Sequence, residues 1–476
     1  MAEYEAVIGL EVHAQLLTNS KLFCSCSTNF GGSPNANVCP VCLGLPGSLP
    51  VLNARAVEMA VTAALALGCT IHGKSIFARK NYFYPDLPKG YQISQYEEPF
   101  STRGELEVEL EGGKKRIGIT RVHMEEDAGK NVHGVGGDSL VDLNRAGVPL
   151  VEIVGDPDLR SSAEAAAYLR ALRDVLVFTG VNDGNLEEGS FRCDANVSIR
   201  PRGATKLGTR CELKNINSFR FVQRAIDAEI ARQTAIVDAG GKIVQETRSF
   251  DPDTGQTKTL RSKEEAHDYR YFPEPDLPPL TLDAAFVERC KAALPELPAQ
   301  VRARFVERGL TAATAQTLTQ HPALVAFFEA ACRRFDQPVK VANFVANEVL
   351  RGAKLHGLTA TFSVTPEQVG ELLELVERGE ISGKQAKDVY AAIEGTDQRP
   401  SAVVEQRGMR VVSDEGALRA VVEALVKKFP DQAASMRAGK KGVLGFFVGQ
   451  AMKETGGSAN PKLVSALLEE VIGSGS

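Results

Sequence analysis

The sequence predicts an α+β protein in which an antiparallel sheet comes first and helices follow. Up to about residue 292, short segments of alternating apolar and polar residues are separated by glycine, proline and charged turns, a pattern typical of antiparallel strands. From residue 293 onward, apolar residues recur at the helical period. A proline-rich stretch from Phe272 to Pro279 separates the two patterns, because proline fits neither a helix interior nor a central strand.

The length of 476 residues is too great for one compact core, so we expect several domains. The patterns predict a sheet-containing domain over residues 1–292, an all-helical domain over 293–398 and a small helical tail domain over 399–476. Residues 395–400, rich in turn-forming types, predict the linker between the last two.

Three helices have clear sequence signals. A helix near 161–179 begins with a predicted capping box formed by Ser161 and Glu164. A second helix is expected near 218–238. Thr365, followed directly by proline, predicts the start of a third helix in the second half of the chain.

The overall composition is that of an ordinary globular protein, with 43% hydrophobic and 24% charged residues. No apolar run is long enough to cross a bilayer, and the acidic N-terminus lacks the features of a signal peptide. We therefore expect a cytoplasmic protein without membrane contact. The net charge of −5 gives no global nucleic-acid signal, so any RNA would be bound by a local basic surface or by shape.

Four cysteines near the N-terminus have the spacing of a zinc site. Cys24 and Cys26 form one close pair, and Cys39 and Cys42 form another after a loop of twelve residues. Two thiolate pairs of this kind suit tetrahedral zinc, and four thiolates would close the site, which favours a structural Zn²⁺. The alternatives are four reduced structural cysteines or a redox pair, the latter less expected because no βαβ pattern surrounds it.

Four predicted strands carry acids, imidazole and cations on one face. Side chains two residues apart on a strand share a face, so the alternation gathers the following sets: Glu11, His13 and Gln15; Arg192, Asp194, Asn196 and Ser198; Arg210, Glu212 and Lys214; and a segment ending in Glu125, Glu126 and Asp127. Mg²⁺ prefers oxygen ligands, and phosphates bind Arg and Lys. The alternative is a solvated outer face of the sheet. No P-loop or Rossmann motif is present, so an ATP site here would be of another type.

Taken together, these segments resemble the B subunit of the heterotrimeric aspartyl/glutamyl-tRNA amidotransferases (the GatB/GatE family). The resemblance covers nearly the whole chain and is carried by these motifs: Gly9 to His13, Arg79 to Gln95, His123 to Lys130, Asp142 to Arg145, Glu188 to Asn196, Lys214 to Phe219, Asp268 to Asp276 and Gly445 to Lys453.

The resemblance implies a cradle-shaped catalytic domain related to glutamine synthetase, then a helical domain and a tail domain that binds tRNA. It also implies ATP-dependent phosphorylation of the side-chain carboxylate on Glu-tRNA(Gln) or Asp-tRNA(Asn). Ammonia from the amidase subunit of the heterotrimer would displace the phosphate, and a small third subunit would tie the two larger ones together.

With this resemblance, the predicted Mg²⁺ ligands are Glu11, His13, Glu125 and Glu126, with Asp194 nearby. Candidate partners for phosphate are Lys89, Arg192 and Lys214. Candidate contacts to the tRNA backbone are Lys384, Lys387, Lys440, Lys441 and Lys453.

Two other functions stay open on the sequence. One is a stand-alone ATP-dependent amide ligase acting on a small acid, which the appended helical domains disfavour. The other is a zinc-containing RNA-binding adaptor without chemistry. Mg²⁺-dependent ATP binding separates the enzyme from the adaptor.

Overall fold

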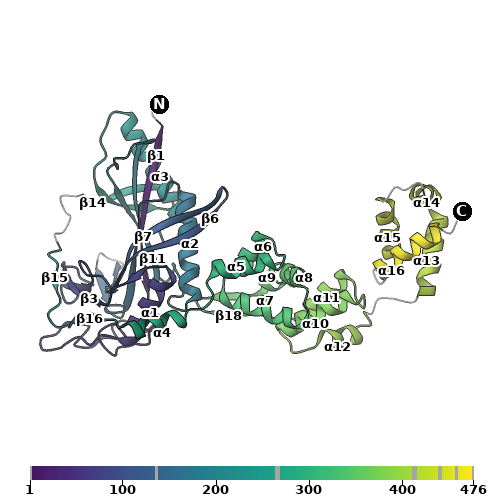
Figure 1. The fold of residues 1–476 in the computed structure, drawn as a ribbon, viewed down its shortest axis with the longest axis horizontal. Coiled ribbons are helices and arrows are strands. Elements are labelled where there is room, and N and C mark those ends of the chain that lie inside the picture. Colours follow the sequence, from purple (N-terminus) through teal and green to yellow (C-terminus); the bar gives the residue numbers. More distant parts are fainter. Residues whose placement is uncertain are drawn as a thin grey trace. The chain divides into compact units, whose positions relative to one another are not determined.

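The computed structural model describes residues 3–133, 138–262, 269–409, 415–437, 442–455 and 459–473. The chain divides into two compact units, Met1–Gln300 with His356–Leu358 and Val301–Leu355 with Thr359–Ser476. The first unit contains a large sheet with helices and the second is mainly helical, so the predicted α+β class is confirmed (Figure 1). The finer division at residues 292 and 398 stays a prediction.

A nine-stranded sheet organises the first unit, in the order β14-β13-β12-β11-β1-β10-β7-β6-β2. Neighbouring strands are antiparallel except β12 and β13, which are parallel. The strands are β1 (Tyr4–Gln15), β2 (Thr70–Ile71), β6 (Ser101–Leu110), β7 (Gly113–Glu126), β10 (Pro149–Gly155), β11 (Phe191–Pro201), β12 (Cys211–Lys214), β13 (Glu246–Asp251) and β14 (Gln256–Ser262).

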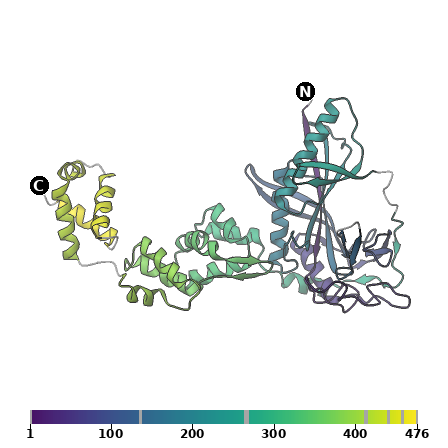
Figure 2. The ribbon, with the colours of Figure 1, turned by 180° about the vertical axis from the view of Figure 1, so that it is seen from behind.

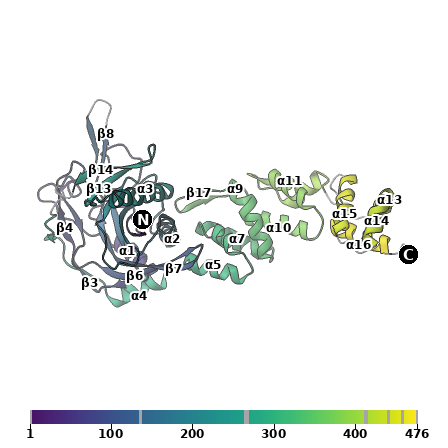
Figure 3. The same cartoon turned by 90° about the horizontal axis from the view of Figure 1, so that it is seen from above.

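Smaller sheets lie beside the large one. One has the order β15-β4-β5, and two-stranded pairs are formed by β16 with β3 and by β8 with β9. Figure 3 shows β8 projecting from the first unit. The strands are β3 (Lys74–Ser75), β4 (Ala78–Asn81), β5 (Tyr91–Ser94), β8 (Lys130–His133), β9 (Ser139–Asp142), β15 (Phe272–Pro273) and β16 (Leu280–Thr281).

The core of the first unit lies between the large sheet and helices α1 (Ala54–Ala66), α2 (Ser162–Phe178) and α3 (Phe219–Asp238) (Figure 2). Leu10, Val12 and Ala14 of β1 are buried in this core, whereas the residues between them are only partly buried. Burying a leucine or valine side chain contributes roughly 1.5–3 kcal/mol. The apolar alternation therefore fixes which face of β1 meets the helices and leaves its polar residues on the other face.

The predicted helices near 161–179 and 218–238 are confirmed as α2 and α3. The predicted capping box of α2 is only half formed. The Ser161 hydroxyl accepts a hydrogen bond from the Glu164 amide at 3.1 Å. The Glu164 carboxylate instead accepts from the Arg160 amide at 2.8 Å and binds Lys115 at 2.7 Å. The nearby lysine competes for the carboxylate, so Glu164 does not reach back to Ser161.

The remaining helices follow the sheet. They are α4 (Ala284–Ala292), α5 (Pro298–Glu307), α6 (Ala312–Leu318), α7 (Pro322–Arg334), α8 (Pro338–Phe344), the π-helical turn η2 (Val345–Val349), α9 (Leu350–Gly352), α10 (Pro366–Glu377), α11 (Gly383–Ile393), α12 (Pro400–Gln406), α13 (Glu415–Lys428), α14 (Pro430–Arg437), α15 (Gly442–Glu454) and α16 (Pro461–Gly473). A hairpin of β17 (Lys354–His356) and β18 (Thr359–Thr361) lies among them. No helix in the described part of the chain is long and apolar enough to cross a membrane.

Helix α10 begins at the predicted position, where Thr365 and Gln368 form a complete capping box. The Gln368 side chain also donates to the carbonyls of Thr396 and Gln398, at 2.9 and 2.8 Å. The predicted linker is therefore a turn tied to α10, and α12, which follows it, packs against α10 and α11. Helices α13 to α16 bury a separate apolar core of their own.

Candidate metal and nucleotide site

The polar face of the sheet gathers residues from five adjacent strands, β7, β10, β1, β11 and β12. In the backbone register His13 pairs with Glu152, and Glu152 pairs with His123 on its other side. In the same way Glu11 pairs with Asp194. Paired residues of neighbouring strands point to the same face, so the register alone brings these side chains together.

His13, Glu125 and Glu152 form the tightest group of ligand atoms on this face, all within 4.8 Å of one another. The His13 Nε2 lies 3.5 Å from the Glu152 carboxylate. His123 Nε2 lies 3.3 Å from Glu125 and 3.5 Å from Glu152. Two carboxylates and an imidazole at this spacing fit a divalent cation, and His123 is placed to orient both carboxylates.

Crowded carboxylates surround this group. Burial raises the pKa of Glu11 above its ordinary value, and the charges of Glu152, Glu212 and Asp194 raise it further. Burial also disfavours the charged form of Glu152, but the neighbouring imidazoles of His123 and His13 hold its pKa well below the usual range. A cluster of buried acids at one place is costly unless a cation neutralises it, which again favours metal binding.

The main cavity, of about 320 Å³, is lined by His13 and Glu152 of this group, whereas Glu125 is not among its lining residues. Glu11, His13, Asp194 and Lys214 of the predicted set line it. Lys214 is bound to Asp194 at 2.6 Å and to Glu212 at 3.0 Å. The complete lining is Glu11, His13, Lys80, Glu152, Asp194, Asn196, Arg210, Glu212, Lys214, Gln245, Glu246, Thr247 and Tyr269.

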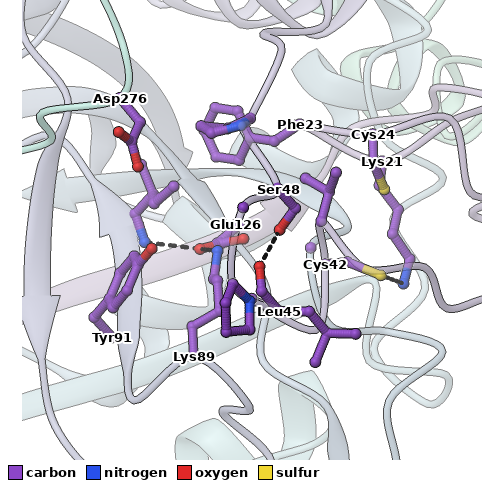
Figure 4. Close-up of a pocket in the computed structure, with 17 residues that line it drawn as sticks. Lys21, Phe23, Cys24, Cys42, Leu45, Ser48, Lys89, Tyr91, Glu126 and Asp276 are labelled. Atoms are coloured by element: carbon purple, nitrogen blue, oxygen red, sulfur yellow. Dashed lines mark hydrogen bonds and ion pairs between the residues drawn. The ribbon is translucent and has the colours of Figure 1, made fainter.

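Glu126 does not share this cavity, contrary to the expectation of a single site. It lines a second cavity of about 200 Å³ together with Lys89, Cys24 and Cys42 (Figure 4). There its carboxylate accepts from the Ile93 amide at 2.9 Å and is paired with Lys89. Successive residues on a strand point to opposite faces, so Glu125 and Glu126 separate at the end of β7.

Arg192 is also engaged elsewhere. Its guanidinium binds the buried carboxylate of Asp127 at 2.9 Å, and Asp127 accepts a second hydrogen bond from Gln15 at 2.7 Å. Of the three predicted phosphate partners, Lys89 and Arg192 therefore lie outside the main cavity and are paired with acids. Lys214 lines the cavity but is paired as well.

The four predicted zinc ligands come together. The sulfur atoms of Cys24, Cys26, Cys39 and Cys42 lie within 4.8 Å of one another. Tetrahedral zinc with Zn–S bonds of about 2.3 Å places sulfurs roughly 3.8 Å apart, so the cluster fits the ion. Lys21, which is fully buried, sends its ammonium to within 3.6 Å of the Cys42 sulfur and donates to the Asn37 carbonyl at 2.7 Å. A buried cation here would offset the negative charge of a four-thiolate site.

Glu152, His123 and Lys80 were not predicted as site residues. Glu152 is a lone acid inside an apolar strand that runs Pro-Leu-Val-Glu-Ile-Val, and a charge in such a strand is itself a signal. His123 was visible in the alternation of its segment. Lys80 lies in a short strand of a different sheet, so no pattern within one strand could place it at the same cavity as the acids.

Two family descriptions together match most of the chain. Residues 6–288 match the family described as the GatB/GatE catalytic domain, and residues 326–472 match the GatB domain. The chain belongs to the GatB/GatE family. The resemblance inferred from the motifs is thereby confirmed, and the catalytic-domain match includes both cavities and the four cysteines.

Relatives in this family are similar over their whole length. The chain is 56% identical over 481 residues to the B subunit of the aspartyl/glutamyl-tRNA(Asn/Gln) amidotransferase of Anaeromyxobacter dehalogenans, covering 99% of each chain. It is 55% identical over 472 residues to the protein of the same name from Geotalea uraniireducens, covering 98% of each. It is 54% identical over 476 residues to that of Myxococcus xanthus, covering 99% of each.

Proposed function

We propose that this chain is the component of a cytoplasmic, glutamine-dependent amidotransferase that activates and amidates Glu-tRNA(Gln) or Asp-tRNA(Asn). Its relatives are named as the B subunit of such an enzyme, which supports assembly into a heterotrimer with a small third subunit and an amidase. The observation that carries the chemistry is the group of His13, Glu125 and Glu152 beneath a cavity of about 320 Å³ lined by further acids and cations.

The proposed reaction begins with phosphoryl transfer. A carboxylate oxygen of the tRNA-bound amino acid attacks the γ-phosphorus of ATP, and ADP leaves. Ammonia from the amidase then attacks the acyl carbon and phosphate leaves, which gives the amide. A divalent cation held by His13, Glu125 and Glu152, with Glu11 nearby, would neutralise charge on the phosphates. Asp194 positions Lys214 at the cavity wall through their 2.6 Å ion pair.

The four cysteines are proposed to hold a structural Zn²⁺, because four closely spaced thiolates leave no open coordination position. Its contribution is to the folding of residues 21–50 rather than to the reaction. The helical parts of the chain are proposed to bind the tRNA body.

A variant of Glu152 tests the proposed metal site. In the assembled complex, Glu152→Gln should lower tRNA-dependent ATP hydrolysis by about 10²-fold or more, because one anionic ligand of the cation is lost. Glutamine hydrolysis by the amidase should continue. Glu164→Gln, which removes a carboxylate bound to Lys115 away from the cavity, is the matched control.

Two experimental results would contradict this proposal and favour another function. ATP hydrolysis and amide formation that are indifferent to added aminoacyl-tRNA would favour the stand-alone ligase. A complex that binds tRNA but no Mg²⁺-ATP would favour the adaptor.

A further inference from the structure

Lys80 is a partly buried cation of the main cavity and belongs to a different sheet from the acids beneath that cavity. Lys80 lies on β4, in the small β15-β4-β5 sheet, and yet its side chain lines the cavity over the large sheet. The pairing of Lys80 with Gln92 of β5 fixes its strand in place. The small sheet therefore contributes a positive charge to a cavity whose floor belongs to another sheet.

The ammonium of Lys80 is partly buried and stays charged. Burial favours the neutral form, but attraction by Glu125 first, and also by Glu152, raises the pKa of Lys80 above its ordinary value. Its nitrogen lies 5.1 Å from the centroid of the Tyr269 ring, a cation–π contact that holds the side chain beside the cavity.

Lys80 differs in its partners from the other partly buried cations near the cavity; Arg210, which likewise has no ion pair among the described residues, is exposed. Lys214 is bound to two carboxylates and Arg192 to one. Within the described parts of the chain, the Lys80 side chain makes no ion pair and donates no hydrogen bond, although it is attracted by the acids through space. An ammonium carries three donors, and a partly buried one is best satisfied by an anion that brings its own acceptors.

The cavity thus offers groups of both charges to a ligand. The group of His13, Glu125 and Glu152 suits a divalent cation, which Lys80 would repel. A ligand that satisfies both the carboxylates and Lys80 must carry negative oxygens and a bound cation together. Polyphosphate with a divalent metal is the chemical class that does so.

We propose that Lys80, which lines the cavity from β4, binds a phosphate group of the metal-bound nucleotide. This inference rests on the proposed function and gives Lys80 the role that the sequence had suggested for Lys89 and Arg192. The wall formed by β4 and Tyr269 is then part of the nucleotide site.

The test uses the assembled complex with Lys80→Met, Lys80→Arg and Lys74→Met. Lys74 is an exposed lysine on β3 outside this cavity and serves as the matched control. Mn²⁺ binding is measured by electron paramagnetic resonance without nucleotide, and the binding of a non-hydrolysable ATP analogue with Mn²⁺ by calorimetry. Lys80→Met should weaken analogue binding about 10-fold or more and leave Mn²⁺ alone bound equally or more tightly. Lys80→Arg should recover part of the loss.

Weaker binding of the ATP analogue together with unchanged or tighter binding of Mn²⁺ alone distinguishes an electrostatic role of Lys80 from a structural one. Equal weakening of Mn²⁺ and analogue in Lys80→Met would mean that the variant damages the cavity, and it would overturn the inference. Unchanged analogue binding with a raised KM for the aminoacyl-tRNA would assign Lys80 to the substrate carboxylate and also overturn it. A wild-type complex that binds no Mn²⁺-analogue would instead refute the proposed function itself.

Discussion

At the scale of single residues, the face of the strand to which a side chain points decides which partners it meets, even for two residues of the same type. Glu125 and Glu126 are identical neighbours, and both are almost fully buried. Glu125 accepts from Gln92 at 3.0 Å and lies within ligand distance of His13 and Glu152. Glu126 points into the second cavity and pairs with Lys89. Glu125, a proposed metal ligand, and Glu126, the partner of Lys89, therefore differ in role because adjacent residues on a strand point to opposite faces.

The hydroxyl of Tyr168 gives a prediction at the same scale. The Tyr168 side chain is fully buried against the sheet, and its hydroxyl has no hydrogen-bond partner among the described residues. Removing a buried polar atom without a partner relieves a desolvation cost, so Tyr168→Phe should raise the free energy of unfolding by about 1 kcal/mol. Chemical denaturation of the two proteins measures this, and a comparable loss of stability would reveal a partner for the hydroxyl.

At the scale of elements, the cysteine loop is packed against the second cavity. Gly44 follows the last cysteine with φ +66°, and a Cβ there would collide with the Lys89 side chain. Gly147, with φ +86°, adopts the left-handed backbone conformation that favours glycine, although a Cβ there would meet Cys42 and Glu126 only at ordinary contact distances of 3.5 and 3.9 Å. Glycine at position 44 therefore leaves room for the Lys89 side chain, which pairs with Glu126.

This packing predicts an effect of zinc removal. A strong chelator should loosen residues 39–50, because the thiolates lose their common partner, and should expose Lys89, whose side chain is 8% exposed in the folded chain. Acylation of lysines followed by mass spectrometry should show several-fold faster labelling of Lys89. Lys115, bound to Glu164 elsewhere on the sheet, should keep its rate. Equal labelling of Lys89 with and without zinc would contradict the coupling.

A second element-scale prediction concerns α3 and pH. Glu229 of α3 is fully buried beside β13 and β14 and accepts hydrogen bonds from Arg232 and Gln233, both at 2.7 Å. Burial opposes its charge, but these bonds and the charge of Arg248 leave the pKa of Glu229 lowered from 4.5. The Glu229 carboxylate therefore binds a proton less readily in the folded state than in the unfolded state. The ionised carboxylate stabilises the folded state fully above about pH 4.5.

The stabilising effect of Glu229 should disappear as the pH falls below that value. Denaturation of wild type and Glu229→Gln between neutral and acidic pH measures the difference in unfolding free energy. We expect the wild type to be more stable near neutrality and the difference to shrink on acidification. A difference in unfolding free energy that does not change with pH would mean that the shape of the Glu229 side chain, and not its charge, stabilises the fold.

At the scale of the whole molecule, the chain combines a first unit, which contains the large sheet and the proposed catalytic site, with a second, mainly helical unit. The tail helices α13 to α16 bury their own core. Of the predicted tRNA contacts, Lys384 and Lys453 are exposed, Lys387 is bound to Glu348 at 2.9 Å, and Lys440 and Lys441 lie outside the described residues.

The tRNA proposal predicts a change in salt dependence. Replacing both Lys384 and Lys453 by alanine should weaken tRNA binding and reduce the slope of log affinity against log salt, because fewer counterions are released. Filter binding of the assembled complex at several salt concentrations measures the slope. Lys74→Ala, on the sheet unit, is the control. An unchanged slope in the double variant would mean that the RNA lies elsewhere.

The sequence by itself determined the class of the fold, the family, the four cysteines and the polar face of each strand. These properties are local, because apolar alternation, capping residues and cysteine spacing act over a few positions. The start of α10 at Thr365 and the outward face of Glu11 and His13 are examples.

Only the tertiary structure decided which of the polar residues meet. The order of strands placed β10 between β1 and β7 and so brought Glu152 between His13 and His123. It also set Lys80, from another sheet, over the same cavity and turned Glu126 away from it. Strand order and the packing of one sheet on another depend on contacts far apart in the chain, and a pattern within one segment does not contain them.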